Sequence, residues 1–279
     1  MNGVRSVFAV IPAGEAAAGA VAAFQALPLA ANAKLVGLHV SPLAITYGLV
    51  TDITLASFIE AQIAAADEER KAAESAFRRA CQQAGIAFDW RAEKAPYTIV
   101  SAHAGSLARA ADIVLCPRLP DNATVGRHQL EEVIFASGRP VIGLPVDWSA
   151  KQFGGRVLVA WDGGREATRA AFDALPILIA AKAVRLISVR GFHDEPVRQF
   201  TPGDDIAATL SRHGVPVETA AIVTTGQSVH DELKVQAMDF GADIIVMGCY
   251  GHSRLRERIL GGVSRDMLKE MPFPLLLSN

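Results

Sequence analysis

Short apolar runs alternate along this chain with longer stretches in which apolar residues recur at helical spacing. In its second half the apolar runs predict strands at 157–162, 184–189, 216–222, 242–247 and 273–277. The stretches between them predict helices at about 165–180, 203–213, 228–239 and 262–270. The run from Ala242 to Met247 is almost wholly apolar, as expected of a central parallel strand that is covered on both faces. Strands that alternate with helices in this way indicate βαβ units and a parallel sheet.

The same pattern occurs twice along the 279 residues. Phe24-Gln25-Ala26-Leu27-Pro28 recurs as Phe172-Asp173-Ala174-Leu175-Pro176, and Ala111 to Leu115 corresponds to Ala242 to Val246. We therefore predict two tandem copies of one unit, at residues 1–150 and 151–279, joined by a short polar linker that contains glycine. In the first copy the second helix is expected to be much longer, at roughly 55–84.

Five parallel strands with helices on both faces favour a doubly wound, Rossmann-like α/β fold with the strand order 3-2-1-4-5 in each copy. In such sheets ligands bind beyond the carboxyl ends of the strands, at the point where the strand order reverses. For this order, that point lies between strands 1 and 4. In the second copy strand 1 runs into Asp162-Gly163-Gly164, and strand 4 runs into Gly248. Both strand ends therefore carry residues of a kind that can contact a ligand.

A glycine-containing segment follows strand 4 of the second copy, with the spacing Gly248-x2-Gly251-x9-Gly261-Gly262-Val263-Ser264. Glycine permits positive φ and has no Cβ to keep the backbone away from a phosphate, and amides at a helix start attract anions. The spacing fits neither G-x-G-x-x-G nor a Walker A loop. Two readings stay open: a phosphate cradle, or glycines that only end a strand and cap a helix.

Asp162 also has two readings. Its carboxylate can accept hydrogen bonds from an exocyclic amine or a ribose hydroxyl. Alternatively it is the N-cap of the helix that follows, and both roles can coexist.

The glycine segment resembles the motif of the universal stress protein family, whose nucleotide-binding members carry G-x2-G-x9-G followed by Ser or Thr. Gly248, Gly251 and Gly261 match this motif, whereas Gly262 stands where the family has the hydroxyl residue. The strand from Val157 to Asp162 resembles the opening strand of the family. At fold level the resemblance covers the whole chain as a tandem pair, but its motif lies only in the second copy.

This resemblance implies the positions of an adenine nucleotide. Asp162 would contact the adenine end of ATP, and the backbone at Val189 would border the base. The residues that would surround the ribose and the phosphates are Gly248, Gly251, Gly261, Gly262, Val263 and Ser264.

The corresponding site in the first copy lacks the residues that a phosphate cradle needs. Pro12 replaces the aspartate, and Pro117 and Pro120 stand where the second copy has Gly248 and Gly251. Proline has no amide donor and fixes φ, so no cradle can form there. We therefore predict one nucleotide site per chain.

Composition excludes several other classes of protein. The formal net charge is -2 and no basic block occurs, which argues against a nucleic-acid partner. The apolar runs are too short to span a membrane and the N-terminus has no signal-peptide pattern, so we expect no membrane partner and a cytoplasmic location. Three cysteines without C-x2-C spacing argue against a disulfide framework and a zinc site. We assign no catalytic residue and no metal ligand.

Three functions remain, and the resemblance favours the first. It implies a cytoplasmic stress-response protein that binds ATP or ADP, with or without Mg²⁺, and acts as a nucleotide-dependent regulatory module toward an unidentified protein partner. The alternatives are a weak ATPase or a phosphoryl or adenylyl transferase, and a scaffold that binds no nucleotide. An enzyme would also need a base and charge-neutralising groups, which the sequence does not plainly supply.

The last strand of each copy is short and apolar, at 141–144 and 275–277. Such an edge needs cover. Universal stress proteins commonly pair these edges between subunits, so we predict that the two copies pair theirs within one chain as a pseudo-dimer. Association into a homo-oligomer is left open.

Overall fold

The structure is a computed structural model that describes residues 4–28, 32–43, 53–119, 129–146, 148, 153–190, 203–224, 226–250 and 262–279. Its first half contains the strands β1 (Ser6–Val10), β2 (Lys34–Leu43), β3 (Phe88–Pro96), β4 (Ile113–Pro117) and β5 (Val141–Leu144). The helices of this half are α1 (Ala16–Ala26), α2 (Ile53–Ala84), α3 (Val100–Leu107) and α4 (Gln129–Ser137), with short 3-10 turns η2 (Tyr97–Ile99) and η3 (Ala108–Ala110).

The second half repeats this order of elements. Its strands are β6 (Arg156–Ala160), β7 (Ala183–Arg190), β8 (Val217–Val223), β9 (Ile244–Gly248) and β10 (Leu275–Ser278). Its helices are α5 (Arg165–Asp173), α6 (Leu175–Ala180), α7 (Asp204–Arg212), α8 (Val229–Phe240) and α10 (Val263–Glu270). The boundary predicted between residues 150 and 151 falls outside the described residues and stays a prediction.

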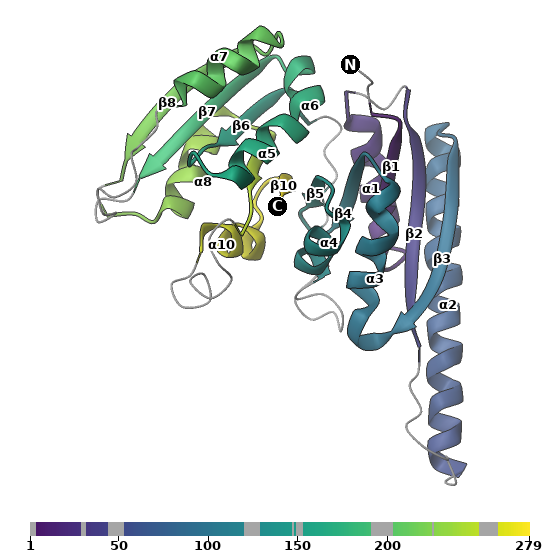
Figure 1. The fold of residues 1–279 in the computed structure, drawn as a ribbon. Helices are drawn as coiled ribbons and strands as arrows, with labels where there is room; N and C mark the ends of the chain where they lie inside the picture. The colour runs from purple at the N-terminus through teal and green to yellow at the C-terminus, as the bar shows by residue number, and fades with distance from the viewer. Residues whose placement is uncertain are drawn as a thin grey trace.

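The described strands form one sheet of ten, in the order β3-β2-β1-β4-β5-β10-β9-β6-β7-β8. Each half therefore has the predicted order 3-2-1-4-5, which confirms the doubly wound α/β fold. Neighbouring strands within each half are parallel, whereas β5 and β10 pair antiparallel, with Ile142 opposite Leu276. Figure 1 shows the two halves side by side and joined at these two strands. The last strands of the two copies thus pair within one chain, as predicted.

Buried apolar residues form a layer on each face of the sheet, and both layers contain residues from both halves. One layer lies beneath α1, α2, α5, α6 and α7, and the other beneath α3, α4, α8 and α10. The strands at the centre of the joined sheet are fully buried, since Val141, Ile142 and Leu275 are 0% exposed. The junction between the halves is therefore part of the core.

The single helix predicted at 165–180 is two helices. Ala174 closes α5 and opens α6, and Pro176 lies in the first turn of α6. Because proline has no N–H, residue 176 cannot continue the hydrogen-bond ladder of α5, but it is well tolerated at the start of a new helix. The long helix predicted at about 55–84 is α2, whose N-terminal part extends well past the sheet (Figure 1).

Candidate functional site

The strand order of the second half reverses between β6 and β9. β6 pairs with β7 on one side and with β9 on the other, and all three strands are parallel. Their carboxyl ends therefore lie at one edge of the sheet, where β6 leads into Trp161 and Asp162 and β9 ends at Gly248. This edge is where ligands bind in doubly wound folds.

Asp162 lies in the turn between β6 and α5, and its side chain is exposed. Its Oδ1 accepts a hydrogen bond from the backbone N–H of Gly164 at 2.8 Å. The N-cap of α5 is Gly164 itself, and no side chain caps it. Asp162 is therefore not the N-cap residue, but it stabilises the turn that leads to the cap. Its second oxygen, Oδ2, accepts no hydrogen bond from the described residues and so remains available to a ligand.

Gly248 is needed for space. A Cβ at this position would lie 2.4 Å from the backbone nitrogen of Ala167 and 2.4 Å from the carbonyl carbon of Glu166, both in the first turn of α5. Gly248 has no positive φ, so the expected left-handed backbone is not what requires glycine at this point. The absence of a side chain instead lets α5 approach the end of β9, which brings the Asp162 turn and the start of the glycine segment together.

Among the described residues of this segment, left-handed backbone occurs at a residue that is not glycine. Tyr250 has φ of 62°. The residue before it, Cys249, is buried, and both its N–H, at 2.9 Å, and its Sγ, at 3.3 Å, donate to the carbonyl oxygen of Ser278 at the end of β10. Strand β10 therefore holds the chain in place where it leaves β9.

The structure describes only some of the remaining residues of this segment. Gly251 and Gly261 lie outside the described residues. Gly262 is the N-cap of α10, with φ of -71° and ψ of 146°, and no side chain caps this helix. Val263 and Ser264 form its first turn. An uncapped helix start presents free N–H groups and the positive end of the helix dipole, which fits an anionic group.

Val189 is partly buried on β7, where it pairs with Ile222 of β8 and packs in the layer that includes α8 and α10. It lies near the carboxyl end of the strand next to β6, as the expected position beside the base requires. The assignment of all eight residues to a nucleotide site stays a prediction.

At the equivalent edge of the first half, the strands pair in the same way. Arg118 N–H donates to Leu144 O at 2.8 Å, as Cys249 N–H does to Ser278 O. Pro117 closes β4 at the position that Gly248 has in β9. The structure thus confirms that proline and glycine stand at equivalent places, whereas Pro120 lies outside the described residues.

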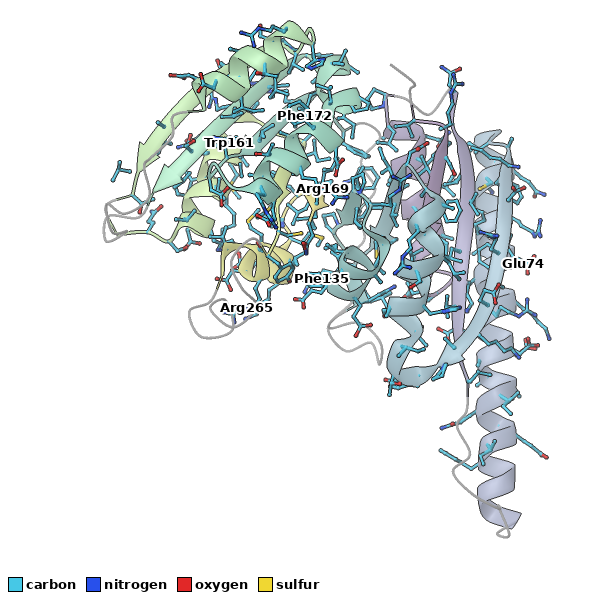
Figure 2. All side chains as sticks on the ribbon, in the orientation of Figure 1. Glu74, Phe135, Trp161, Arg169, Phe172 and Arg265 are labelled. Atoms are coloured by element: carbon cyan, nitrogen blue, oxygen red, sulfur yellow. The ribbon has the colours of Figure 1, made fainter. Side chains whose placement is uncertain are left out.

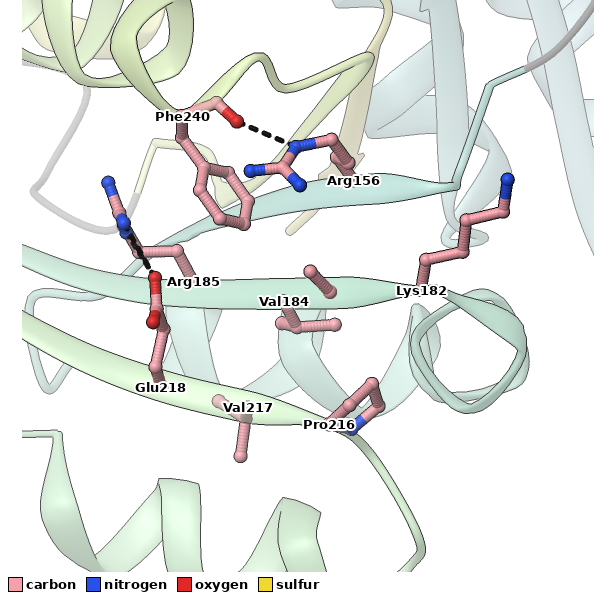
Figure 3. A pocket seen from close by; sticks show the side chains of 9 residues that line it. Arg156, Lys182, Val184, Arg185, Pro216, Val217, Glu218 and Phe240 are labelled. Atoms are coloured by element: carbon pink, nitrogen blue, oxygen red, sulfur yellow. Dashed lines mark hydrogen bonds and ion pairs between the residues drawn. The ribbon is translucent and has the colours of Figure 1, made fainter.

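One hollow among the described residues lies away from this edge. It measures about 390 Å³ and opens at the amino-terminal ends of β6, β7 and β8 (Figure 3). The Phe240 ring has the guanidinium groups of Arg156 and Arg185 each 4.4 Å from its centroid. Arg156 also donates to the carbonyl oxygen of Phe240 at 2.7 Å, and Arg185 forms an ion pair with Glu218 at 2.6 Å. These contacts pack the end of α8 against the sheet, so we assign the hollow no ligand.

Residues 155–278 match the model of the Universal stress protein family. The second half of this chain belongs to the universal stress protein family. A universal stress protein of Methanocaldococcus jannaschii is 40% identical over 48 residues, which are 17% of this chain. That match spans 30% of the relative, less than a third of its length.

Solved structures of universal stress proteins share the fold across both halves. One from Archaeoglobus fulgidus superposes with a TM-score of 0.62 at 16% identity, over 98% of this chain and 96% of its own. A putative universal stress protein of Pseudomonas aeruginosa gives a TM-score of 0.55 at 14% identity, over 99% and 93% of the two chains. At such low identity the likeness concerns the fold alone. It covers the first half as well as the second.

Two further kinds of feature do not occur within the described ranges. No group of three or more His, Cys, Asp or Glu side chains there is arranged to hold a metal ion. No helix there has both the length and the apolar character that a membrane crossing needs. Burial raises the pKa of the Cys116 thiol to about 12 and that of the Cys81 thiol to about 11, which leaves both as unreactive core residues.

Sequence reasoning did not find the residues that hold this site in place. Tyr250 and the first turn of α5 at Glu166 and Ala167 had no motif to mark them. Neither did Phe135, whose ring packs against that of Tyr250, nor Arg169, which donates a hydrogen bond to the carbonyl oxygen of Gly138. Their roles depend on contacts between residues far apart in the sequence, which no local pattern encodes.

Proposed function

We propose that the second half of this universal stress protein binds ATP or ADP at the carboxyl edge of β6 and β9, and that nucleotide occupancy controls its contact with a protein partner. The observation that carries this proposal is that β6, which leads into Asp162, and β9, which ends at Gly248, are neighbouring parallel strands at the point where the strand order reverses. Doubly wound folds bind nucleotides at this point.

The chemistry of the described residues fits the two ends of such a ligand. Oδ2 of Asp162, which accepts no hydrogen bond from the described part of the chain, can accept one from the adenine amine or a ribose hydroxyl, while Oδ1 accepts the N–H of Gly164. The uncapped start of α10 at Gly262 supplies amide donors and the positive end of its dipole for phosphates. In this proposal, the amides of Gly251 and Gly261 complete the cradle. Mg²⁺ would accompany the triphosphate and neutralise part of its charge, and we assign it no protein ligand.

Calorimetric titration of the full chain with ATP tests the proposal. We expect one site per chain, because Pro117 lacks the amide that a cradle in the first half would need. The Gly251→Val variant should lose most of this affinity, since a β-branched residue disfavours positive φ and keeps phosphates away from the backbone. Two equal sites per chain, or a Gly251→Val variant that binds as the parent does, would contradict the assignment. A chain without any ATP or ADP affinity would instead be an interaction scaffold.

A further inference from the structure

The first half of the chain contacts the start of the glycine segment directly. Phe135, on α4, packs its ring against the ring of Tyr250, with 4.7 Å between centroids and 47° between planes. Figure 2 places Phe135 at the junction, between the two halves. Tyr250 lies between Gly248 and Gly251, so an element of the copy without a cradle touches the segment proposed to bind the phosphates.

A second connection joins the same two regions through polar groups. Arg169 of α5 donates from Nη2 to the carbonyl oxygen of Gly138, just after α4, at 2.8 Å. Its Nε lies 3.5 Å from Oδ2 of Asp173, and that oxygen accepts a hydrogen bond from Oγ of Ser278 at 2.8 Å. The carbonyl of Ser278 in turn accepts the N–H of Cys249 at 2.9 Å. A continuous chain of contacts therefore runs from the first half to the residue before Tyr250.

The backbone of Tyr250 explains why these contacts matter. Its φ of 62° is unfavourable for a residue with a Cβ, and such a conformation persists only where the surroundings hold it. The surroundings include the ring of Phe135 on one side and the pairing of Cys249 with Ser278 on the other. Loss of the Phe135 ring therefore removes one of the contacts that oppose a return of Tyr250 to ordinary backbone angles.

We propose that α4 of the first half is a brace that holds Tyr250, at the start of the proposed phosphate-binding segment, in the backbone conformation that binds nucleotide. Phe135 is thus a positioning residue, and the inference rests on the proposed nucleotide site. Because coupling between two equilibria is reciprocal, nucleotide binding also tightens the contact between the halves. The first half therefore contributes to a nucleotide site although it has no cradle of its own.

The test compares ATP affinity in four full-length proteins: the parent, Phe135→Ala, Phe135→Tyr and Phe88→Ala. Phe135→Ala removes the ring contact and should weaken ATP binding about two- to tenfold, the range that corresponds to an aromatic pair. Phe135→Tyr keeps the ring and should restore the affinity. Phe88 is the matched control. It lies on β3, at the far edge of the first half, and its ring packs against that of Phe77 with 5.6 Å between the ring centroids. Its loss should leave ATP affinity unchanged.

Hydrogen exchange supplies a second readout that does not require nucleotide. In the absence of ATP, amides at residues 248–250 should exchange faster in Phe135→Ala than in the parent or in Phe88→Ala. Arg169→Gln, which breaks the polar connection, should act in the same direction. In the parent, ATP should slow exchange at 129–138.

The outcomes separate the two proposals. If the parent does not bind ATP, the proposed function fails, and the exchange at 248–250 alone decides whether the brace exists. If the parent binds ATP but Phe135→Ala matches it in both affinity and exchange, the brace is wrong while the nucleotide site stands.

Discussion

Gly248→Ala separates two reasons for a glycine at the end of β9: space for α5, or space for a phosphate. The added Cβ would lie 2.4 Å from two backbone atoms of α5, at Glu166 and Ala167. Comfortable contacts between such atoms begin near about 3.5 Å, so β9 and α5 would have to separate by about 1 Å. A helix backbone cannot rotate away as a side chain can. Overpacking of a core usually costs about 1–3 kcal/mol, and we expect about 2–3 kcal/mol here because backbone must move.

Urea unfolding, followed by the fluorescence of Trp161 and the other tryptophans, measures this loss. Gly14→Ala is the matched control, since its Cβ would meet only ordinary contacts, the nearest 3.4 Å from the carbonyl oxygen of Ala72. That variant should differ from the parent by no more than about 0.5 kcal/mol. A Gly248→Ala protein that is as stable as the parent would refute the packing argument. If such a protein also lost ATP binding, glycine would be required there for the ligand alone.

Substitutions at three further positions test single residues. Gly262→Ser adds a capping side chain to α10, so urea unfolding should show a gain of a few tenths of a kcal/mol and titration an ATP affinity between unchanged and about tenfold tighter. Asp162→Ala should weaken the binding of ATP and ADP but hardly affect the binding of inorganic triphosphate. Asp162→Asn can keep the hydrogen bond from Gly164 and so tests whether the charge of the carboxylate matters. Equal losses of affinity for ATP and triphosphate would contradict a role at the base. Burial lowers the pKa of His39, so the unfolded chain binds the proton more readily than the folded chain. The free energy of unfolding should therefore fall as the pH drops below about 6.5, by at most about 1.4 kcal/mol per pH unit. His39→Gln should flatten this slope in urea titrations between pH 7 and 5, and an unchanged slope would show that other groups cause it.

The sequence allowed the fold to be predicted because the relevant signals are local and repeated. Apolar runs such as Ala242 to Met247 fixed which strands are central, and the duplicated pattern doubled the support for each strand. The short apolar runs at 141–144 and 275–277 indicated an edge that must be covered, and β5 and β10 pair there. The break at Ala174 was missed because Pro176 can either interrupt a helix or begin one, and only the packing of the two segments decides between these.

The sequence predicted where the candidate site lies but not which contacts hold its parts together. A glycine in a sequence can mean positive φ, room for a ligand or room for another part of the chain. The sequence alone does not distinguish these three roles. At Gly248 the structure assigns room for α5, and among the described residues of the segment the positive φ occurs at Tyr250. A tyrosine carries no mark of that backbone, and Phe135, which packs on it, lies more than 100 residues earlier in the chain.

Only the second half has a glycine at the end of its strand 4, whereas the first half has proline at the equivalent place. Pro117 costs the sheet nothing, because the ladder bond to β5 comes from the next residue, Arg118, and β1 pairs with β4 only as far as Leu115. The same topology thus tolerates a large side chain at this place, and doubly wound packing alone does not demand glycine there. The close approach of α5 to Gly248 is a feature of the second half, where it also carries the turn that holds Asp162. Glycine at the end of β9 is therefore required by the way α5 packs in the second half, whereas the first half, with proline at the equivalent place, pairs β5 with β10 and contacts Tyr250 through Phe135.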